Sequence, residues 1–460
     1  MSPARAAAVE VLLAPPGLVP ARLDRALARG TLVAEDRALL AEIVLGTLRM
    51  RRRLEHALAP LLARPLERLS PRVRAILESA AYQILFLSRV PAYAAVNEAA
   101  HLARHGGRAA TVGFVNAVLR RLASRPGEVA LPDPAADPVR ALAVRHSYPD
   151  WIARRTLAEI GAEEADAFLA CGNRAPAATL RANRLRGGRD ALLARLAAEG
   201  IAAEPCRHAP DGVRLLERAF LPGLDVLRDG LASVQDESAI LVAEIVAPAP
   251  GETVVDLCAA PGGKALAIAE RGLAGLRVVA IDRPARVARL RENVARLGLV
   301  PIARRADGRE EGSAAGRVAG GRAPRVELLA GDARALDPIP ADAVLVDAPC
   351  SGLGVLRRHA DLRWTKRESD VARLAALQGA LLDAAARWVR PGGRLVYATC
   401  TILGAENEDV VRAFLERHPR FALEPLPESI AEFTAAGFFR TWPQRHDMDG
   451  AFACCLRSAR

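Results

Sequence analysis

Two cysteines, Cys350 and Cys400, each follow an apolar run that predicts a buried strand. The run before Cys350 covers 343–346 and leads into Asp347, and the run before Cys400 covers 394–397. Strands of an open α/β sheet place chemistry at their carboxyl ends. We therefore expect the two thiols and the carboxyl group of Asp347 to lie in one cleft.

Two thiols beside a carboxyl group suit covalent catalysis on a pyrimidine ring. C5 of a pyrimidine is a poor nucleophile, but a thiolate that adds at C6 makes C5 an enamine-like carbon that can attack a methylsulfonium. A second base must then remove the C5 proton so that the thiol can be eliminated. Asp347 is placed to hydrogen-bond or protonate ring N3. A single buried cysteine is usually a small hydrophobic residue, and this is our interpretation of Cys171, Cys206, Cys454 and Cys455.

A third predicted strand, over 253–257, runs into a glycine-containing turn and then a helical pattern. The turn consists of Cys258, Ala259, Ala260, Pro261, Gly262, Gly263 and Lys264. Its glycines let the backbone approach a ligand, and the start of the following helix presents free N–H groups. It is not a Walker loop, because Ala265 stands where Ser or Thr is required. The lysine is a specific choice, since Lys366 is the only other lysine in the chain.

Two further carboxylates end predicted strands of the same sheet. Asp282 follows the turn by one strand, where a carboxylate can accept both ribose hydroxyl groups of a nucleoside cofactor. Asp332 ends the next strand and could reach the adenine side of such a cofactor. Asp307 is a competing candidate, but it lies in a Gly/Ala/Arg-rich stretch over 304–324 that reads as a flexible surface insertion. We prefer Asp332, because it leads directly into the strand over 342–346.

Composition and charge indicate a multidomain protein with a polyanionic partner. The chain has 460 residues, 51% of them hydrophobic and 25% charged, which predicts two or three globular domains. The net charge is +11, and residues 1–125 hold 19 arginines against 9 acidic residues. Clustered arginine is typical of nucleic-acid binding; a solvated helix surface is the alternative. Aromatic residues make up only 4%, which argues against a surface of stacked rings.

The cysteine content predicts a reduced, cytoplasmic protein. Seven cysteines is an odd number, and they form no CxxC pair and no metal-ligand spacing. We therefore expect no metal site. The amino-terminal segment is a poor signal peptide, because Glu10 interrupts its apolar stretch. No run of 18 uncharged apolar residues is present, so we expect no membrane span.

The pattern of elements predicts three domains. Residues 1–130 read as all-α, with helices over 34–62, from Ser70 onward, over 94–103 and over 110–122. A proline-rich linker over 125–138 leads to a helical and small α+β connecting domain over 139–230. The third domain covers 231–460, and strand and helix patterns alternate in it from Glu252 onward, which predicts an α/β, doubly wound, Rossmann-like parallel sheet.

On these motifs the chain resembles the RNA (cytosine-5)-methyltransferase family. The matching segments are Asp256-Leu-Cys-Ala-Ala-Pro-Gly-Gly-Lys264, Asp347-Ala-Pro-Cys-Ser-Gly352, Tyr397-Ala-Thr-Cys-Thr401, Glu406-Asn-Glu408, Ser233-Val-Gln-Asp-Glu-Ser-Ala239 and His446-Asp-Met-Asp-Gly450. Residues 1–125 are similar to the NusB fold through segments 91–98 and 114–120. The combination resembles the bacterial branch that methylates 16S ribosomal RNA.

The resemblance implies a role for each candidate residue. Cys400 matches the nucleophile of the family. Cys350 matches the second cysteine of the family, which is associated with product release. Asp347 matches the carboxylate that contacts the cytosine. The positions that match the S-adenosylmethionine site are 258–264, Asp282, Asp332 and Asp347 itself. The implied activity is methyl transfer from S-adenosylmethionine to C5 of a cytosine in 16S ribosomal RNA.

Two other functions fit part of the sequence. The same chemistry could act on transfer RNA, and only the NusB-like extension favours ribosomal RNA. A non-catalytic RNA-binding assembly protein could use the same fold, but it would have no need of two thiols at strand ends. The expected partner is ribosomal RNA of an unassembled or partly assembled small subunit. We expect the protein to act as a monomer. The target base must leave its stack to be methylated.

Overall fold

The computed structural model describes residues 2–30, 32–105, 109–125, 129–217, 219–304, 310–311, 317–318, 321–322 and 324–460. The chain forms two compact units. The helical unit comprises residues 1–174 and 356–368, and the sheet unit comprises 175–355 and 369–460. These limits differ from the predicted domains, because the helices over 138–171 group with the amino-terminal helices. The division at 130, 139 and 230 stays a prediction.

The helical unit contains no β-strand among its described residues. Its helices are α1 (Pro3–Leu12), α2 (Val19–Ala28), α3 (Ala34–Leu58), α4 (Pro71–Phe86), α5 (Ala92–Arg104), α6 (Ala109–Ser124), α7 (Pro138–His146), α8 (Asp150–Cys171) and α14 (Leu362–Thr365). The predicted amino-terminal helices are confirmed within a few residues. Ser70 caps α4 by accepting a hydrogen bond from Val73 N, with Pro71 at the first helical position, as its sequence predicts. Leu40, Ile43 and Val44 of α3 are fully buried in the core.

A segment from the catalytic half of the sequence, 356–368, belongs to the helical unit. Its Arg363 is fully buried and donates hydrogen bonds to Gly172 O at 2.6 Å and to Asn173 Oδ1 at 2.7 Å. The guanidinium carbon lies 3.8 Å from the centroid of the Tyr148 ring. Burial lowers the pKa of Arg363 to about 10, so the side chain stays charged at neutral pH. The segment is therefore anchored by a cation that hydrogen-bonds oxygen atoms of the helical unit.

We expect Arg363→Met to lower the free energy of unfolding of the helical unit by about 3 kcal/mol, because buried oxygen atoms lose their donor. The measurement is the loss of helical circular dichroism in urea. Arg367→Met is the matched control. Its side chain is exposed, so its effect should stay within about 0.5 kcal/mol. Equal unfolding midpoints for wild type and Arg363→Met would contradict the anchoring role.

The sheet unit begins with a small antiparallel sheet. Its strands are β1 (Thr179–Ala182), β2 (Ala203–Pro205), β3 (Gly212–Leu215) and β4 (Ala232–Val234), in the order β2-β3-β1-β4, with helices α9 (Gly188–Ala198) and α10 (Asp225–Arg228). The α+β unit predicted from the sequence is confirmed, although β4 lies beyond its predicted end at 230. Buried Arg181 of β1 pairs with buried Glu270, which ties the small sheet to the catalytic half.

The second sheet of this unit is mixed. Its strands are β5 (Thr253–Asp256), β6 (Arg277–Asp282), β7 (Val300–Arg304), β8 (Glu310–Glu311), β11 (Arg325–Ala330), β12 (Ala341–Asp347), β13 (Val389–Thr399), β14 (Phe421–Glu424), β15 (Thr434–Ala435), β16 (Phe438–Thr441) and β17 (Ala451–Ser458). Their order is β15-β16-β17-β13-β12-β5-β6-β11-β7-β8, and β14 pairs with β17. The run from β13 to β7 is parallel, as predicted, whereas β14 to β17 and β8 pair antiparallel.

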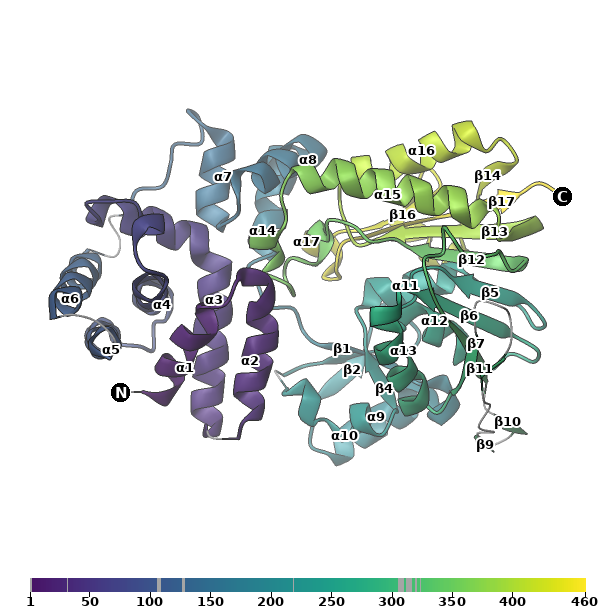
Figure 1. Ribbon diagram of the computed structural model, residues 1–460, viewed down its shortest axis with the longest axis horizontal. Helices are drawn as coiled ribbons and strands as arrows, with labels where there is room; N and C mark the ends of the chain where they lie inside the picture. Colours follow the sequence, from purple (N-terminus) through teal and green to yellow (C-terminus); the bar gives the residue numbers. More distant parts are fainter. Residues whose placement is uncertain are drawn as a thin grey trace. The chain divides into compact units, whose positions relative to one another are not determined.

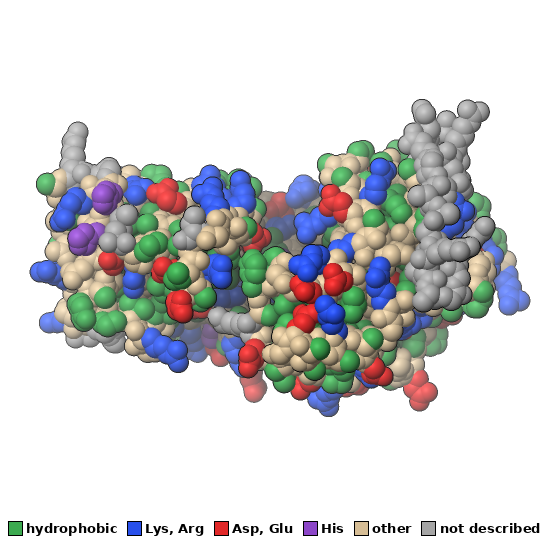
Figure 2. All heavy atoms as spheres, turned by 90° about the horizontal axis from the view of Figure 1, so that it is seen from below, with side chains coloured by type: hydrophobic (Ala, Val, Ile, Leu, Met, Phe, Trp, Pro, Cys, Tyr) green, Lys and Arg blue, Asp and Glu red, His purple; other side chains and the backbone are tan. Residues whose placement is uncertain are grey.

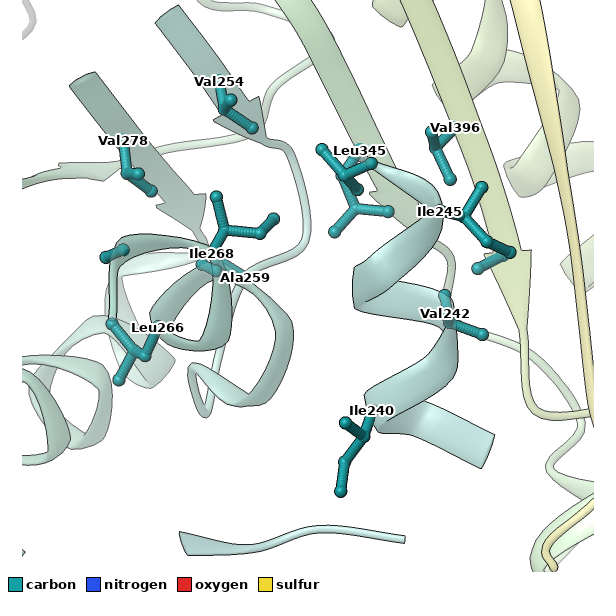
Figure 3. Close-up of a cluster of buried hydrophobic side chains, with 14 of the residues drawn as sticks. Ile240, Val242, Ile245, Val254, Ala259, Leu266, Ile268, Val278, Leu345 and Val396 are labelled. Carbon is teal, nitrogen blue, oxygen red and sulfur yellow. The ribbon is translucent and has the colours of Figure 1, made fainter. Parts of the chain in front are cut away.

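Helices cover both faces of this sheet, which confirms the doubly wound prediction (Figure 1). The helices of the sheet unit beyond the small sheet are α11 (Glu237–Ile245), α12 (Gly263–Ala269), α13 (Pro284–Arg296), α15 (Ser369–Ala386), α16 (Glu408–Arg417) and α17 (Pro443–His446). Leu345 of β12 packs with the cluster of α11, α12 and α13, and its neighbour Val346 packs with that of α15 and α16. This alternation is the period of a strand buried on both faces. Figure 3 shows Val242 and Ile245 of α11 near Leu345 and Val396.

The insertion predicted over 304–324 is described only in part. Its described pieces include β8 and the pair β9 (Arg317–Val318) and β10 (Gly321–Arg322). Asp307 lies outside the described residues. In the part of the chain that the structure describes, no helix is long and apolar enough to cross a membrane.

Candidate functional site

The site lies where the strand order of the sheet reverses. From β5 the chain continues to β6 on one side, and β12 lies on the other side of β5. In open α/β sheets, ligands bind at the carboxyl ends of the strands that flank such a point. The loops after β5, β12 and β13 carry the cofactor turn, Cys350 and Cys400. The three motifs therefore meet at one edge of the sheet, as the sequence predicts.

The two thiols are in direct contact. The Sγ atoms of Cys350 and Cys400 lie 3.1 Å apart, and Cys400 N donates to Cys350 Sγ at 3.3 Å. The hydrogen bond with Cys400 and then burial raise the pKa of Cys350 well above its ordinary value. Cys350 therefore keeps its proton at neutral pH and can donate it to the Cys400 sulfur. Cys171, Cys206, Cys454 and Cys455 are buried, which confirms their interpretation as core residues.

Lys264 connects the cofactor turn to the Asp347 carboxylate. Its Nζ lies 2.6 Å from Asp347 Oδ2. Burial lowers the pKa of Lys264, but the charge and hydrogen bond of Asp347, together with the charges of Cys400 and Asp256, outweigh this effect, so the pKa is raised overall. Lys264 is therefore a cation that faces the Asp347 carboxyl group. The sequence predicted only a cofactor-binding role for it.

Buried polar side chains hold the two cysteine loops together. Glu406 is fully buried and accepts hydrogen bonds from Ser351 N at 2.9 Å and from Gln378 Nε2 at 3.0 Å. Ser351 Oγ and Thr401 Oγ1 lie 2.7 Å apart. These contacts fix the distance between the loops that carry Cys350 and Cys400. The site prediction omitted Gln378, a buried polar residue of α15 that lies among apolar residues of the sequence.

The loop after Cys350 also makes a close backbone contact. Gly450 N donates to Gly354 O at 2.9 Å. A Cβ atom at Gly354 would lie 2.1 Å from Gly450 O, which only glycine avoids. Gly450 ends the segment 446–450, one of the segments that match the family, and this segment thus supports the Cys350 loop.

The cofactor turn is shaped by Asp282 and by glycine. Asp282 is 5% exposed, and its Oδ2 accepts a hydrogen bond from Ala260 N at 2.8 Å. Gly262 has a φ of 113°, and a Cβ atom there would lie 2.7 Å from Leu266. No side chain caps α12, so its first N–H groups have no partner within the helix. A carboxylate at the end of β6 and free N–H groups in a glycine turn fit the ribose and the carboxylate of S-adenosylmethionine.

Three other acidic or thiol groups surround this turn. Asp256 is a buried carboxyl group that the predicted site did not include. Burial and then the charge of Asp347 raise the pKa of Asp256 to about 7. Burial raises the pKa of Cys258 far above its ordinary value, so Cys258 stays a neutral thiol. Asp332 follows β11 as predicted, and its Oδ2 lies 2.6 Å from Arg334 Nη2. This ion pair is largely exposed, and the adenine-side role of Asp332 stays a prediction.

We expect Asp282→Ala to weaken S-adenosylmethionine binding by roughly 1.5–3 kcal/mol, the range for hydrogen bonds to a charged group. Isothermal calorimetry measures this directly. Glu292→Ala is the matched control, because Glu292 is an exposed carboxylate on the next helix, α13. Unchanged affinity for Asp282→Ala would show that the ribose is held by another residue.

Three family models match the chain. The model of 16S rRNA methyltransferase RsmB/F matches residues 243–457, the NusB family matches 2–124, and the RsmF/B-like ferredoxin-like domain matches 148–220. Ribosomal RNA small subunit methyltransferase B of Pseudomonas putida is 40% identical over 408 residues, which are 87% of this chain and 84% of that protein. The protein of the same name from Salmonella typhi is 36% identical over 390 residues, covering 85% and 84%.

Solved structures share the fold. The crystal structure of PH0851 has a TM-score of 0.78 at 25% identity and covers 98% of both chains. NSun6 from Pyrococcus horikoshii, solved with the S-adenosylmethionine analogue SFG, has a TM-score of 0.57 at 21% identity and covers 68% of this chain and 99% of that one. The fold, the site at the sheet edge and these relatives agree: this chain belongs to the RsmB/F family of S-adenosylmethionine-dependent 16S ribosomal RNA methyltransferases, with a NusB-like amino-terminal part.

Proposed function

We propose that the protein methylates C5 of a cytosine in 16S ribosomal RNA through a covalent bond between Cys400 Sγ and C6 of the base. The observation that carries this proposal is the thiol pair, with Sγ atoms 3.1 Å apart, beside the Asp347–Lys264 ion pair and the cofactor turn. S-adenosylmethionine supplies the electrophilic methyl group when it is bound at that turn.

Each residue then has one task. The Cys400 thiolate adds to C6 of the flipped cytosine, and the electron pair of the C5–C6 double bond moves toward ring N3, where a proton delivered through Asp347 neutralises it and returns on elimination. C5 then bonds to the methyl group, the methyl–sulfur bond of the methylsulfonium breaks with its electron pair left on the sulfur, and C5 still carries its proton. A base removes that proton, the electron pair forms the C5–C6 double bond, and the Cys400–C6 bond breaks. Cys350 lies against the Cys400 sulfur, where its proton can neutralise the departing thiolate.

Lys264 supports the proposed first step. Its ammonium lies 2.6 Å from the carboxyl group of Asp347, which we place at ring N3, and so it holds that group in position. The Cys350 thiol lies against the Cys400 sulfur. Neither arrangement would serve a protein that only binds RNA, and this favours an enzyme over the non-catalytic assembly protein.

The arginines of the helical unit support an RNA partner. Some of them are used in ion pairs, such as Arg72 with Glu10. Arg22, Arg29 and Arg104 are exposed and have no acidic partner among the described residues. Figure 2 shows Lys and Arg side chains spread over the face it draws, with acidic side chains between them. We propose that RNA of an unassembled or partly assembled small subunit binds there, and that the protein acts as a monomer in the cytoplasm.

Bisulfite sequencing tests the proposed substrate and position. In 16S ribosomal RNA from a strain that lacks this protein, one cytosine should lose its protection against conversion, and wild-type protein should restore it. Transfer RNA from the same strains is sequenced in parallel. Restored protection in transfer RNA alone would assign the activity to transfer RNA, and no change in either RNA would contradict cytosine-5 methylation.

A further inference from the structure

A pocket in the helical unit combines tryptophan side chains with basic side chains. It has a volume of about 560 Å³ and is lined by the start of α8 and by residues of α3 and the 363–368 segment. The lining includes Trp151 and Trp364 and the basic residues Arg51, Arg52, Lys366 and Arg367. We call it the tryptophan pocket. All of its lining residues belong to the helical unit, and none of them lies in the catalytic loops.

Partly exposed tryptophan occurs nowhere else in this chain. The sequence has four tryptophans; Trp388 and Trp442 are buried, at 0% and 9% exposure. Trp151 and Trp364 are the two that remain partly exposed, and both line this pocket. They come from positions 213 residues apart in the sequence. In a chain with few aromatic residues, their meeting at one surface points to a ligand that stacks on rings.

The ring of Trp364 is held in place. Its Nε1 donates a hydrogen bond to Leu48 O at 2.8 Å, and the Arg51 guanidinium carbon lies 5.4 Å from the ring centroid. The guanidinium lies over the ring, so the fixed pair presents a planar cation on which a flat base can stack with little loss of conformational entropy. The rest of the Trp364 side chain packs against the hydrophobic cluster of α1 to α3.

The acidic residues of the pocket are already neutralised. Asp150 pairs with Arg52 at 3.1 Å, and Glu368 pairs with Arg154 and Arg155 at 3.0 and 2.8 Å. Glu55 likewise pairs with Arg51 and Arg74. The basic lining residues outnumber the acidic ones, so the pocket has a positive balance that suits a phosphate group.

We propose that the tryptophan pocket binds a nucleotide of single-stranded RNA, with the base stacked on tryptophan and the neighbouring phosphates held by arginine and lysine. Base stacking on aromatic side chains combined with basic side chains along the backbone is the general mode of single-strand binding. The lining residues belong to the helical unit and not to the loops that carry Cys350 and Cys400, so the nucleotide proposed here is not the target base. The inference rests on the proposed RNA substrate and adds a specific site to it.

Fluorescence anisotropy with the full-length protein tests the pocket. The probes are a labelled uridine decamer and an abasic decamer with the same ribose-phosphate backbone. Trp151→Leu keeps an apolar side chain but removes the aromatic face, and we expect it to weaken binding of the uridine decamer by about tenfold or more. Binding of the abasic decamer should not change. Trp151→Phe should restore most of the affinity, which a merely structural role of Trp151 would not require.

Two controls make the result specific. Tyr93→Leu changes an aromatic side chain of the same unit that is 71% exposed and outside the pocket, and it should leave both affinities unchanged. Arg367→Ala should weaken both probes and reduce the slope of log affinity against log salt by about 0.7, whereas Arg412→Ala, an exposed arginine of α16, should not.

Methyl transfer to deproteinised 16S ribosomal RNA, measured on the same preparations, separates the two proposals. Wild-type transfer together with equal uridine-decamer binding by Trp151→Leu and wild type would overturn the pocket and leave the methylation proposal intact. Weaker binding of the uridine decamer by Trp151→Leu than by wild type, without methyl transfer by either protein, would support the pocket and overturn the methylation proposal. Displacement of the uridine decamer from wild type by polyglutamate at lower concentration than by unlabelled RNA would overturn the RNA assignment in favour of an acidic protein partner.

Discussion

Replacing Cys400 by alanine should abolish methyl transfer while cofactor binding stays nearly intact. Removal of a covalent nucleophile costs at least about 10⁴-fold in rate, because C5 of the cytosine is then never activated. The cofactor turn follows β5 and does not use the Cys400 thiol, so calorimetry with S-adenosylmethionine should show an almost unchanged affinity. The rate is measured as transfer of labelled methyl groups to 16S ribosomal RNA.

Cys206→Ala is the control for the loss of a cysteine. Cys206 is buried in the core of the sheet unit, and burial raises its pKa to about 12, so it stays a neutral thiol with no part in the reaction. This variant should transfer methyl groups normally. Normal turnover by Cys400→Ala would remove Cys400 from the mechanism.

Cys350→Ala should fail in a different way. Addition of Cys400 and methylation proceed, but elimination stalls, so the enzyme stays bonded to RNA. The reason is the 3.1 Å contact: without the Cys350 thiol, the departing Cys400 sulfur loses its adjacent proton donor. A denaturing gel should show a slowly migrating band that nuclease treatment removes. If Cys400→Ala produced this band and Cys350→Ala did not, the two roles would be reversed.

The meeting of the two thiols could be predicted because it follows from parallel strands. Cys350 and Cys400 each come after an apolar run, and parallel neighbours end at the same edge of a sheet. Asp282 could be placed by the same argument. The direction of β17 could not, because β17 is buried on both faces, and such a strand has no local pattern that distinguishes parallel from antiparallel pairing.

Contacts between distant segments could not be predicted from the sequence. The ion pair between Lys264 and Asp347 joins two loops, and neither loop carries a local pattern that indicates the other as its partner. The burial of Arg363 in the helical unit was also unforeseen, because arginine is rarely buried without a carboxylate, and here backbone and amide oxygens take that place. For this reason the amino-terminal domain, which looked separable along the sequence, shares its core with residues 356–368.

The most direct test of the central claim is a trapping experiment with RNA that contains 5-fluorocytidine. Fluorine replaces the C5 proton that must leave, so elimination is blocked after addition and methylation. We predict a complex of full-length protein and RNA that survives denaturation, forms only with S-adenosylmethionine, and carries the modified nucleotide on the Cys400 peptide in mass spectrometry. A stable complex on Cys350, or complete methyl transfer to other RNA positions with no adduct at all, would contradict the account.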